Sequence, residues 1–369
     1  DHHVGNRGKR RGPVQSAIEE LPNLVVLNQE LSKERLGGVP TRLVRLGDAN
    51  AESEGMGLLS HGSGLLNRNS DRLGKHEVQE ILALGDLADE LGVDSVWIGD
   101  SLLAKPRHDP LALIGAIAGR TKRVKIGTAV LLPMLRNPVL LAHQVATLDQ
   151  IAEGRMILGV GTARDVPAIR NEFEASGVPF EKRIGRMLEQ MRLCRELWKG
   201  EPVDWEGLWT VKQGELAPVP YTKGGPAIWS GGGVEAALKR AGRYFNGWFP
   251  SGAGTGKDWT EGWRGVQQFA KEAGRDPADI IGAAHVTISV NDDQTKADAE
   301  LDAYLEGYYL RPADEIRTQQ YTFAGNRAAA VDWLGEFAAG GASHMCVRFT
   351  GSNDAAQMEE LIRIREELG

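Results

Sequence analysis

The sequence predicts an α/β protein with a closed (β/α)8 TIM barrel, and three observations lead to that fold class. Short apolar runs recur along the chain, each followed by at least one segment with apolar residues at helical spacing. Eight such strand and helix units occupy roughly 310 residues, which fits a barrel of ~250 residues with insertions. Gly62-Ser63-Gly64 lacks the third glycine that would open a doubly wound dinucleotide fold, the competing architecture.

Composition narrows the classes of function. The chain has 369 residues and a formal net charge of −7, which disfavours a nucleic-acid partner. No apolar stretch approaches the ~18 residues of a membrane span. Cys194 and Cys346 are too few for a disulfide framework, and no cluster has zinc spacing. We therefore expect a cytoplasmic protein without a metal site, a membrane anchor or a nucleic-acid partner.

The first residues differ in pattern from the rest. A basic Lys9-Arg10-Arg11 run precedes one short apolar run at 24–27 and a polar stretch. We interpret residues 1–54 as an N-terminal extension and residues 55–369 as the barrel domain. Whether the extension packs on the domain, packs on a partner subunit or is partly disordered stays open.

The first half of the barrel domain shows the clearest units. Period-2 or continuous apolar patterns predict four strands, at 56–60, 95–99, 124–132 and 156–160. Helices are predicted between them, at 78–91, 110–118 and 138–151. Asp109-Pro110 and Asn137-Pro138 each combine an N-cap side chain with a first-turn proline.

The second half repeats the alternation with insertions. It contains four further predicted strands, at 227–230, 247–249, 284–290 and 344–349. Helices are expected at 184–198, 235–241, 259–273, 295–308, 327–339 and 355–368. Residues 201–217 read as a small hairpin excursion. An irregular insertion precedes the last strand, and its Tyr308, Tyr309 and Tyr321 make it a candidate lid.

Residues that follow the strands are the candidate site, because parallel strands of a barrel end at one face. Ser230, Gly231 and Gly232 precede a helix, where backbone N–H groups and the helix dipole favour a phosphate. A plain tight turn is the alternative. Thr162 and Arg164 are candidates for the same anion, with a surface ion pair as the alternative for Arg164.

Histidines supply candidate acids or bases. His61, at the end of the first strand, and His285, in the seventh strand, are placed to face the barrel mouth. His344 begins the eighth strand and is expected at the opposite rim.

Several short motifs, in order, carry a resemblance to a known family. They are Ile126-Gly-Thr-Ala-Val, Asn137-Pro-Val-Leu-Leu-Ala-His-Gln, Thr147-Leu-Asp, Gly154-Arg155, Gly159-Val-Gly161, Gly177-Val-Pro-Phe-Glu181 and Ala324-Gly-Asn-Arg327. From about residue 56 onward the chain resembles the bacterial luciferase-like family of flavin- or deazaflavin-dependent oxidoreductases. The resemblance does not extend to residues 1–54.

The resemblance implies where a flavin would bind. The isoalloxazine ring is expected beside Thr128-Ala129 and Gly161-Thr162, and the flavin phosphate near Thr162, Arg164 and Ser230–Gly232. Bacterial luciferases have a histidine after the second strand, and Ser101 occupies that position here. Asp100 is then the nearest candidate catalytic group, with N-capping or a structural hydrogen bond as its alternative role.

The function that this resemblance implies is a flavin-dependent monooxygenase. Such an enzyme uses reduced FMN, supplied by a separate flavin reductase, and oxygen to oxidise a small organic substrate. Two alternatives stay open: a deazaflavin-dependent dehydrogenase that transfers a hydride, and a flavin-binding protein without catalysis. A homodimer is expected from the family.

Overall fold

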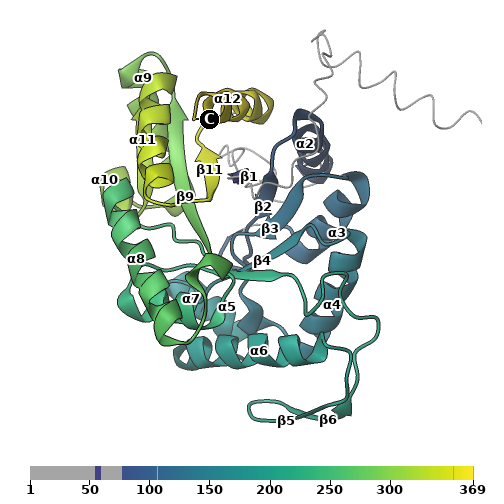
Figure 1. Cartoon of the computed structure of the whole chain (residues 1–369). Helices are drawn as coiled ribbons and strands as arrows, with labels where there is room; N and C mark the ends of the chain where they lie inside the picture. Colours follow the sequence, from purple (N-terminus) through teal and green to yellow (C-terminus); the bar gives the residue numbers. More distant parts are fainter. Residues whose placement is uncertain (1–54, 60–76, 106, 352, 369) are drawn as a thin grey trace, which may run out of the picture. The chain divides into compact units, whose positions relative to one another are not determined.

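The computed structural model describes residues 55–59, 77–105, 107–351 and 353–368 (Figure 1). All of them belong to one unit, Ser53–Gly369. The predicted extension at 1–54 and the candidate acid or base His61 lie outside the described residues. The boundary predicted at residue 55 stays a prediction.

Eight strands of the described residues close a parallel barrel, which confirms the predicted fold class. They are β1 (Gly55–Leu59), β2 (Ser95–Ile98), β3 (Lys125–Thr128), β4 (Met156–Val160), β7 (Ala227–Ser230), β8 (Gly247–Trp248), β9 (Ile281–Val290) and β11 (His344–Phe349). Each pairs in parallel with the next in this order, and β11 pairs with β1. The strand ends therefore form one mouth.

Helices surround the barrel (Figure 1). They are α2 (Glu77–Leu91), α3 (Pro110–Arg120), α4 (Pro138–Ile151), α5 (Pro167–Ala175), α6 (Arg183–Leu197), α7 (Glu235–Tyr244), α8 (Gly256–Glu272), α9 (Gln294–Tyr309), α11 (Arg327–Ala339) and α12 (Asp354–Leu368). The predicted caps are confirmed: Asp109 accepts from the Ala112 N–H, and Asn137 accepts from the Val139 and Leu140 N–H groups. The predicted excursion is the antiparallel hairpin of β5 (Val203–Glu206) and β6 (Thr210–Gly214). No helix within the described ranges is both long and apolar enough to cross a membrane.

The insertion before the last strand is more regular than the sequence indicated. It contains α10 (Ala313–Arg317) and a further strand, β10 (Tyr321–Gly325). β10 pairs with the outer half of β9, beyond the two residues where β9 pairs with β8. The expectation of an irregular stretch was wrong because the middle of β10 is only half-buried and shows no apolar alternation. α5 was likewise missed in a segment interpreted as a polar connection.

The third strand is shorter than predicted. β3 ends at Thr128, a cis peptide bond joins Ala129 to Val130, and Leu131 returns to the sheet in an isolated bridge with Val160. The Gly159 carbonyl accepts hydrogen bonds from the Thr128 hydroxyl at 2.7 Å and from the Leu131 N–H at 2.8 Å. A Cβ at residue 159 would lie 2.0 Å from the Thr128 carbonyl oxygen, so this close approach requires glycine.

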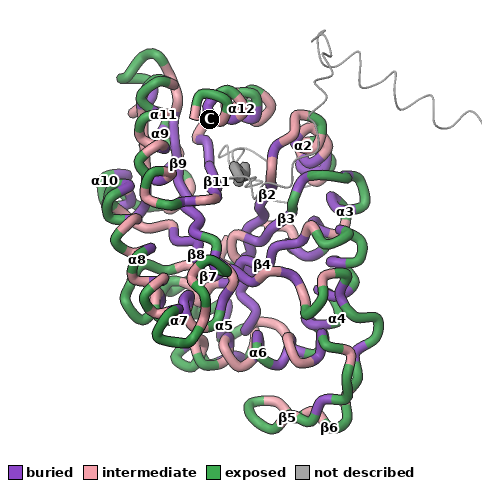
Figure 2. The backbone as a smooth tube through the Cα atoms, viewed as in Figure 1, coloured by how far each residue is buried: buried purple, intermediate pink, exposed green. Residues whose placement is uncertain are grey.

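Large aromatic side chains fill the barrel interior. Trp97, Trp229 and Phe249 form one cluster, with ring centres 5.2 Å apart for the two tryptophans and 4.9 Å for Trp97 and Phe249. Glycines on neighbouring strands make this space, because a Cβ at Gly127 would lie 2.4 Å from Trp97 and one at Gly247 2.6 Å from Trp229. Figure 2 shows the buried residues along the strands and the exposed ones on the outer helix surfaces.

Candidate active site

The ends of β3, β4 and β7 lie side by side at the mouth. Val160 is paired with Ser230, so the loop from Gly161 to Arg164 and the turn from Gly231 to Gly233 are neighbours. Gly161 packs against the loop after β3, since a Cβ there would lie 2.4 Å from Val130 Cγ2. The structure thus brings the sequence-predicted cofactor residues onto adjacent strand ends.

The polar groups in this region differ in whether they are already hydrogen-bonded within the protein. The Thr128 side chain is fully buried and its hydroxyl is engaged by Gly159. The Thr162 carbonyl accepts from Arg183 Nε at 2.8 Å. Arg164 is exposed and donates to Gln319 Oε1 at 3.3 Å. Among the described residues it makes no ion pair, so the surface ion pair left open for it is not seen.

The turn before α7 forms a cradle of backbone N–H donors. In the described part of the chain, the N–H groups of Gly231, Gly232 and Gly233 have no hydrogen-bond acceptor. Val234 is the N-cap of α7 and supplies no capping side chain. Trp248 Nε1 donates to the Gly232 carbonyl at 2.9 Å and fixes the turn. Free N–H groups at a helix N-terminus match the oxygen atoms of a phosphate.

Asp100, after β2, has the structural hydrogen-bonding role that the sequence left open. Arg136 binds it with both guanidinium nitrogens, at 2.6 and 3.1 Å, and the Leu132 N–H donates to it at 2.9 Å. The carboxylate is buried, with 1% of its side chain exposed. Because all these partners donate hydrogen bonds to the carboxylate, Asp100 fixes the segment after β3.

The loop that follows Asp100 is held by one buried carboxylate. Glu172, on α5, accepts from the N–H groups of Leu102 and Ala104, both at 2.9 Å, and from the Ser101 hydroxyl at 3.2 Å. This anchor sets the direction of Lys105, the next residue. Sequence patterns contain no signal for this anchor, because the segment of α5 is typical of a polar connection.

A cationic cluster also lies at the mouth. We define it as Lys105, Arg107, Arg164 and Arg348, which lie around Tyr308 at the end of α9. Lys105 Nζ donates to the Tyr308 carbonyl and lies 3.4 Å from the centre of its ring, and Arg107 donates to its hydroxyl. Burial and the three neighbouring arginines lower the pKa of Lys105 to about 7.

His285 belongs to the same region but is deeply buried. Its Nε2 lies 2.8 Å from Arg348 Nη2, and its ring stacks on Phe249. A guanidinium can only donate, so Nε2 is the acceptor and the proton sits on Nδ1. Burial, together with Arg348, holds the pKa of His285 well below its ordinary value. His285 is therefore a neutral partner that orients Arg348.

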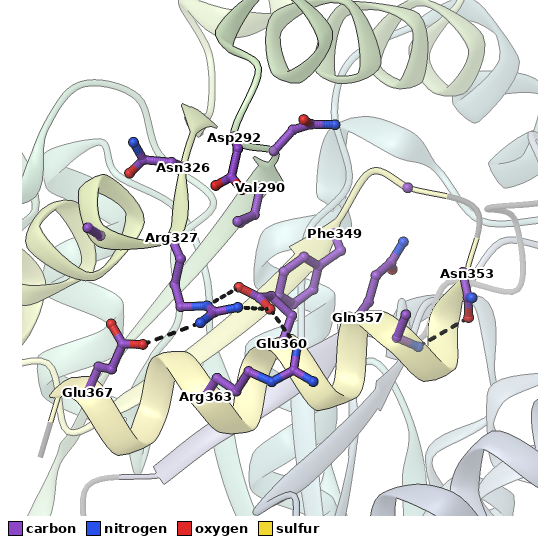
Figure 3. Close-up of a pocket in the computed structure, with 14 residues that line it drawn as sticks. Val290, Asp292, Asn326, Arg327, Phe349, Asn353, Gln357, Glu360, Arg363 and Glu367 are labelled. Atoms are coloured by element: carbon purple, nitrogen blue, oxygen red, sulfur yellow. Dashed lines mark hydrogen bonds and ion pairs between the residues drawn. The ribbon is translucent and has the colours of Figure 1, made fainter. Parts of the chain in front are cut away.

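A separate groove opens beside the mouth (Figure 3). It measures about 840 Å³ and lies at the ends of β9 and β11, between α11 and α12. Its cations are already neutralised, since Arg327 binds both carboxylate oxygens of Glu360 and Arg363 contacts the same group at 3.1 Å. In the described ranges no three His, Cys, Asp or Glu side chains are grouped to hold a metal ion.

The chain is similar to known proteins in sequence and in structure. A family model described as luciferase-like monooxygenase matches residues 60–368. An F420-dependent glucose-6-phosphate dehydrogenase of Rhodococcus erythropolis (strain PR4 / NBRC 100887) is 34% identical over 227 residues, which are 59% of this chain and 67% of the relative. One of Mycolicibacterium gilvum (strain PYR-GCK) is 33% identical over 223 residues, 58% and 66% respectively.

Solved structures give the same fold. An F420-dependent secondary alcohol dehydrogenase in complex with an F420-acetone adduct matches with a TM-score of 0.72 and 21% identity, covering 86% of this chain and 99% of its own. The monooxygenase RslO1 from Streptomyces bottropensis matches with a TM-score of 0.70 and 23% identity, covering 85% and 99%. At these identities the likeness supports the fold alone.

Proposed function

Because the chain belongs to the luciferase-like monooxygenase family, we propose that it is an oxidoreductase that uses a deazaflavin coenzyme of the F420 type to transfer a hydride to or from a small organic substrate. The sequence favoured reduced FMN and oxygen and kept the deazaflavin dehydrogenase as an alternative. The relatives described above are named as F420-dependent enzymes, and they support the alternative.

The glycine turn before α7 is the structural observation that carries this proposal. Its three N–H groups and the uncapped helix end would hold the phosphate of the coenzyme. Gly161 lets the loops after β3 and β4 pack closely where the ring would lie. A bound deazaflavin supplies a ring carbon that exchanges a hydride without oxygen. The protein contributes binding, orientation and exclusion of water.

Coenzyme titration tests the proposal. F420, reduced FMN and the phosphate-free deazaflavin chromophore are each titrated anaerobically into the wild type and into Gly233→Ala. A Cβ at Gly233 meets no atom within 4 Å, so the fold is unaffected while the cradle is narrowed. We expect F420 to bind about tenfold more weakly and the chromophore to bind as before. Gly185→Ala, equally open but on α6, is the control.

Other results would point elsewhere. Saturable binding of reduced FMN with oxygen uptake, and no binding of F420, would restore the monooxygenase. Binding without turnover of any alcohol or sugar phosphate would favour the non-catalytic alternative. Equal weakening of F420 and the chromophore by Gly233→Ala would remove the phosphate assignment. The reductase partner, the homodimer and the cytoplasmic location stay predictions.

A further inference from the structure

We propose that the cationic cluster of Lys105, Arg107, Arg164 and Arg348 binds an oxyanion of the substrate, either a carboxylate or a phosphate. The inference rests on the proposed function, because it names the class of substrate that would meet the coenzyme in this mouth. Three members lie away from the glycine turn, since Lys105 and Arg107 follow β2 and Arg348 lies in β11, whereas Arg164 follows β4 in the loop beside the turn.

Every acceptor that the four cations contact within the described ranges is uncharged. Lys105 and Arg107 donate to oxygen atoms of Tyr308, Arg164 to Gln319, and Arg348 to the Tyr309 hydroxyl and to His285. None of the ion pairs within the described residues includes any of the four. With only neutral acceptors among the described residues, the positive charges of the cluster repel one another, and an anion would relieve that repulsion.

Arg348 has a buried donor that lacks an acceptor among the described residues. It is only 4% exposed, and its two terminal nitrogens are taken by Tyr309 and His285. Its Nε is buried without a hydrogen-bond partner in the described part of the structure. Buried donors are almost always satisfied, and a guanidinium presents a fork that suits an oxyanion.

The surroundings of Lys105 give the proposal a pH signature. The groups that face it are Arg107, Arg164, Arg348 and the rings of Tyr308 and Tyr309. Its pKa is lowered to about 7 by burial and by the three arginines. An anion in the cluster opposes both effects, so binding above pH 7 has to take up a proton at this amine.

Calorimetry with sulfate tests the proposal, since the charge of sulfate is constant between pH 6 and 8.5. We expect wild-type binding to weaken between pH 6 and 8 and to take up a proton at pH 8, detected with buffers of different ionisation enthalpy. Lys105→Met removes this pH dependence. Arg164→Gln, at an exposed position that leaves the fold intact, weakens sulfate about tenfold. Lys122, before β3, is an exposed cation outside the cluster, and Lys122→Gln is the control. It should change neither the affinity for sulfate nor the pH dependence of binding.

Two further arms identify the source of the anion. Acetate and inorganic phosphate replace sulfate to distinguish a carboxylate from a phosphate. Sulfate binding is repeated with F420 present, and persistence supports the substrate assignment. Displacement by F420 but not by its phosphate-free chromophore overturns it, because the coenzyme tail then fills the cluster. Absence of sulfate binding, or equal binding by wild type and both cluster variants, also overturns it. Sulfate binding without F420 binding contradicts only the proposed function.

Discussion

His344 lies at the floor of the barrel, opposite the mouth. Its Nε2 contacts the Ser95 hydroxyl at 2.9 Å, and that hydroxyl also accepts from Trp97 Nε1 at 2.7 Å. Burial, with Lys125 nearby, lowers the pKa of His344 to about 3. A neutral histidine thus forms part of the packing that closes the lower end of the barrel.

This burial makes stability depend on pH. The unfolded chain binds a proton at residue 344 below about pH 6.5 and the folded chain does not, so stability rises with pH from about 3 to 6.5 and is then constant. On acidification from pH 7.5 to 5.5, the burial of His344 lowers the free energy of unfolding by about 1.4 kcal/mol. Urea unfolding at the two pH values measures this difference. We expect the loss of unfolding free energy in His344→Gln to be smaller than in the wild type by that amount.

An exposed histidine provides the control for this experiment. His143 lies on the outer surface of α4, and His143→Gln should retain the wild-type dependence on pH. If His344→Gln lost as much stability as the wild type between pH 7.5 and 5.5, His344 would be protonated in the folded protein.

Among single residues, Asp100 shows what a sequence can and cannot reveal. Its place after the second strand could be predicted, but its partner Arg136 lies 36 residues away, in the turn after β3. That turn depends on how the chain leaves the sheet at Ala129 and returns at Leu131. Strand patterns contain no information on such a detour, so the partners of Asp100 could not be predicted, and its catalytic role stays a prediction.

At the scale of elements, patterns with strong periodicity or strong caps were predicted well. The helices after Asp109 and Asn137 begin where proline and the cap side chain indicated. β10 and α5 were missed for a common reason: each is half-buried or exposed over most of its length, so apolar spacing carries little signal. Both elements nevertheless border the mouth, since α5 supplies Glu172 and β10 extends the sheet beside β9.

The anchor on α5 can be tested through the loop it holds. Glu172→Gln keeps the shape of the side chain but replaces one acceptor oxygen by a donor. Because both carboxylate oxygens accept backbone N–H groups, we expect amide hydrogen exchange at Leu102 and Ala104 to accelerate about tenfold or more. Mass spectrometry of peptides spanning residues 100–105 measures it.

A neighbouring carboxylate supplies the matched comparison. Glu174 is exposed on the same helix, and Glu174→Gln should leave exchange in the loop unchanged. Equal exchange in wild type and Glu172→Gln would mean that the loop is held by other contacts, and the proposed orientation of Lys105 would lose its support.

At the scale of the whole molecule, the mouth is assembled from distant segments. Lys105 and Tyr308 are 203 residues apart, and Arg348 and His285 are 63 apart. Most strand ends could be predicted to within a residue or two, apart from that of β3, and the turn at Ser230–Gly233 was predicted at the correct edge. The cationic cluster was not, because charges gather only when the barrel closes and α9 returns over the strand ends.

Closure itself depends on the fit between glycines and tryptophans in the interior. A Cβ at Gly127 would lie 2.4 Å from the Trp97 ring, which is fully buried against Trp229 and Phe249 and has no free space to enter. We expect Gly127→Ala to lower the free energy of unfolding by about 1–3 kcal/mol in urea denaturation. Gly119→Ala, on the exposed surface of α3 with no atom within 4 Å of the new Cβ, should instead raise it by about 0.5–1 kcal/mol.

A double variant separates steric conflict at the ring from strain in the strand. If the collision with Trp97 is the cause, Gly127→Ala costs much less in the background of Trp97→Leu, whose side chain leaves room for the methyl group. An unchanged cost in that background would place the strain in the backbone of β3 and would contradict the glycine and tryptophan fit. A series of contacts leads up the interior from Trp97 through Phe249 and His285 to Arg348. We therefore expect Gly127→Ala alone, without the Trp97→Leu change, also to weaken sulfate binding at the mouth.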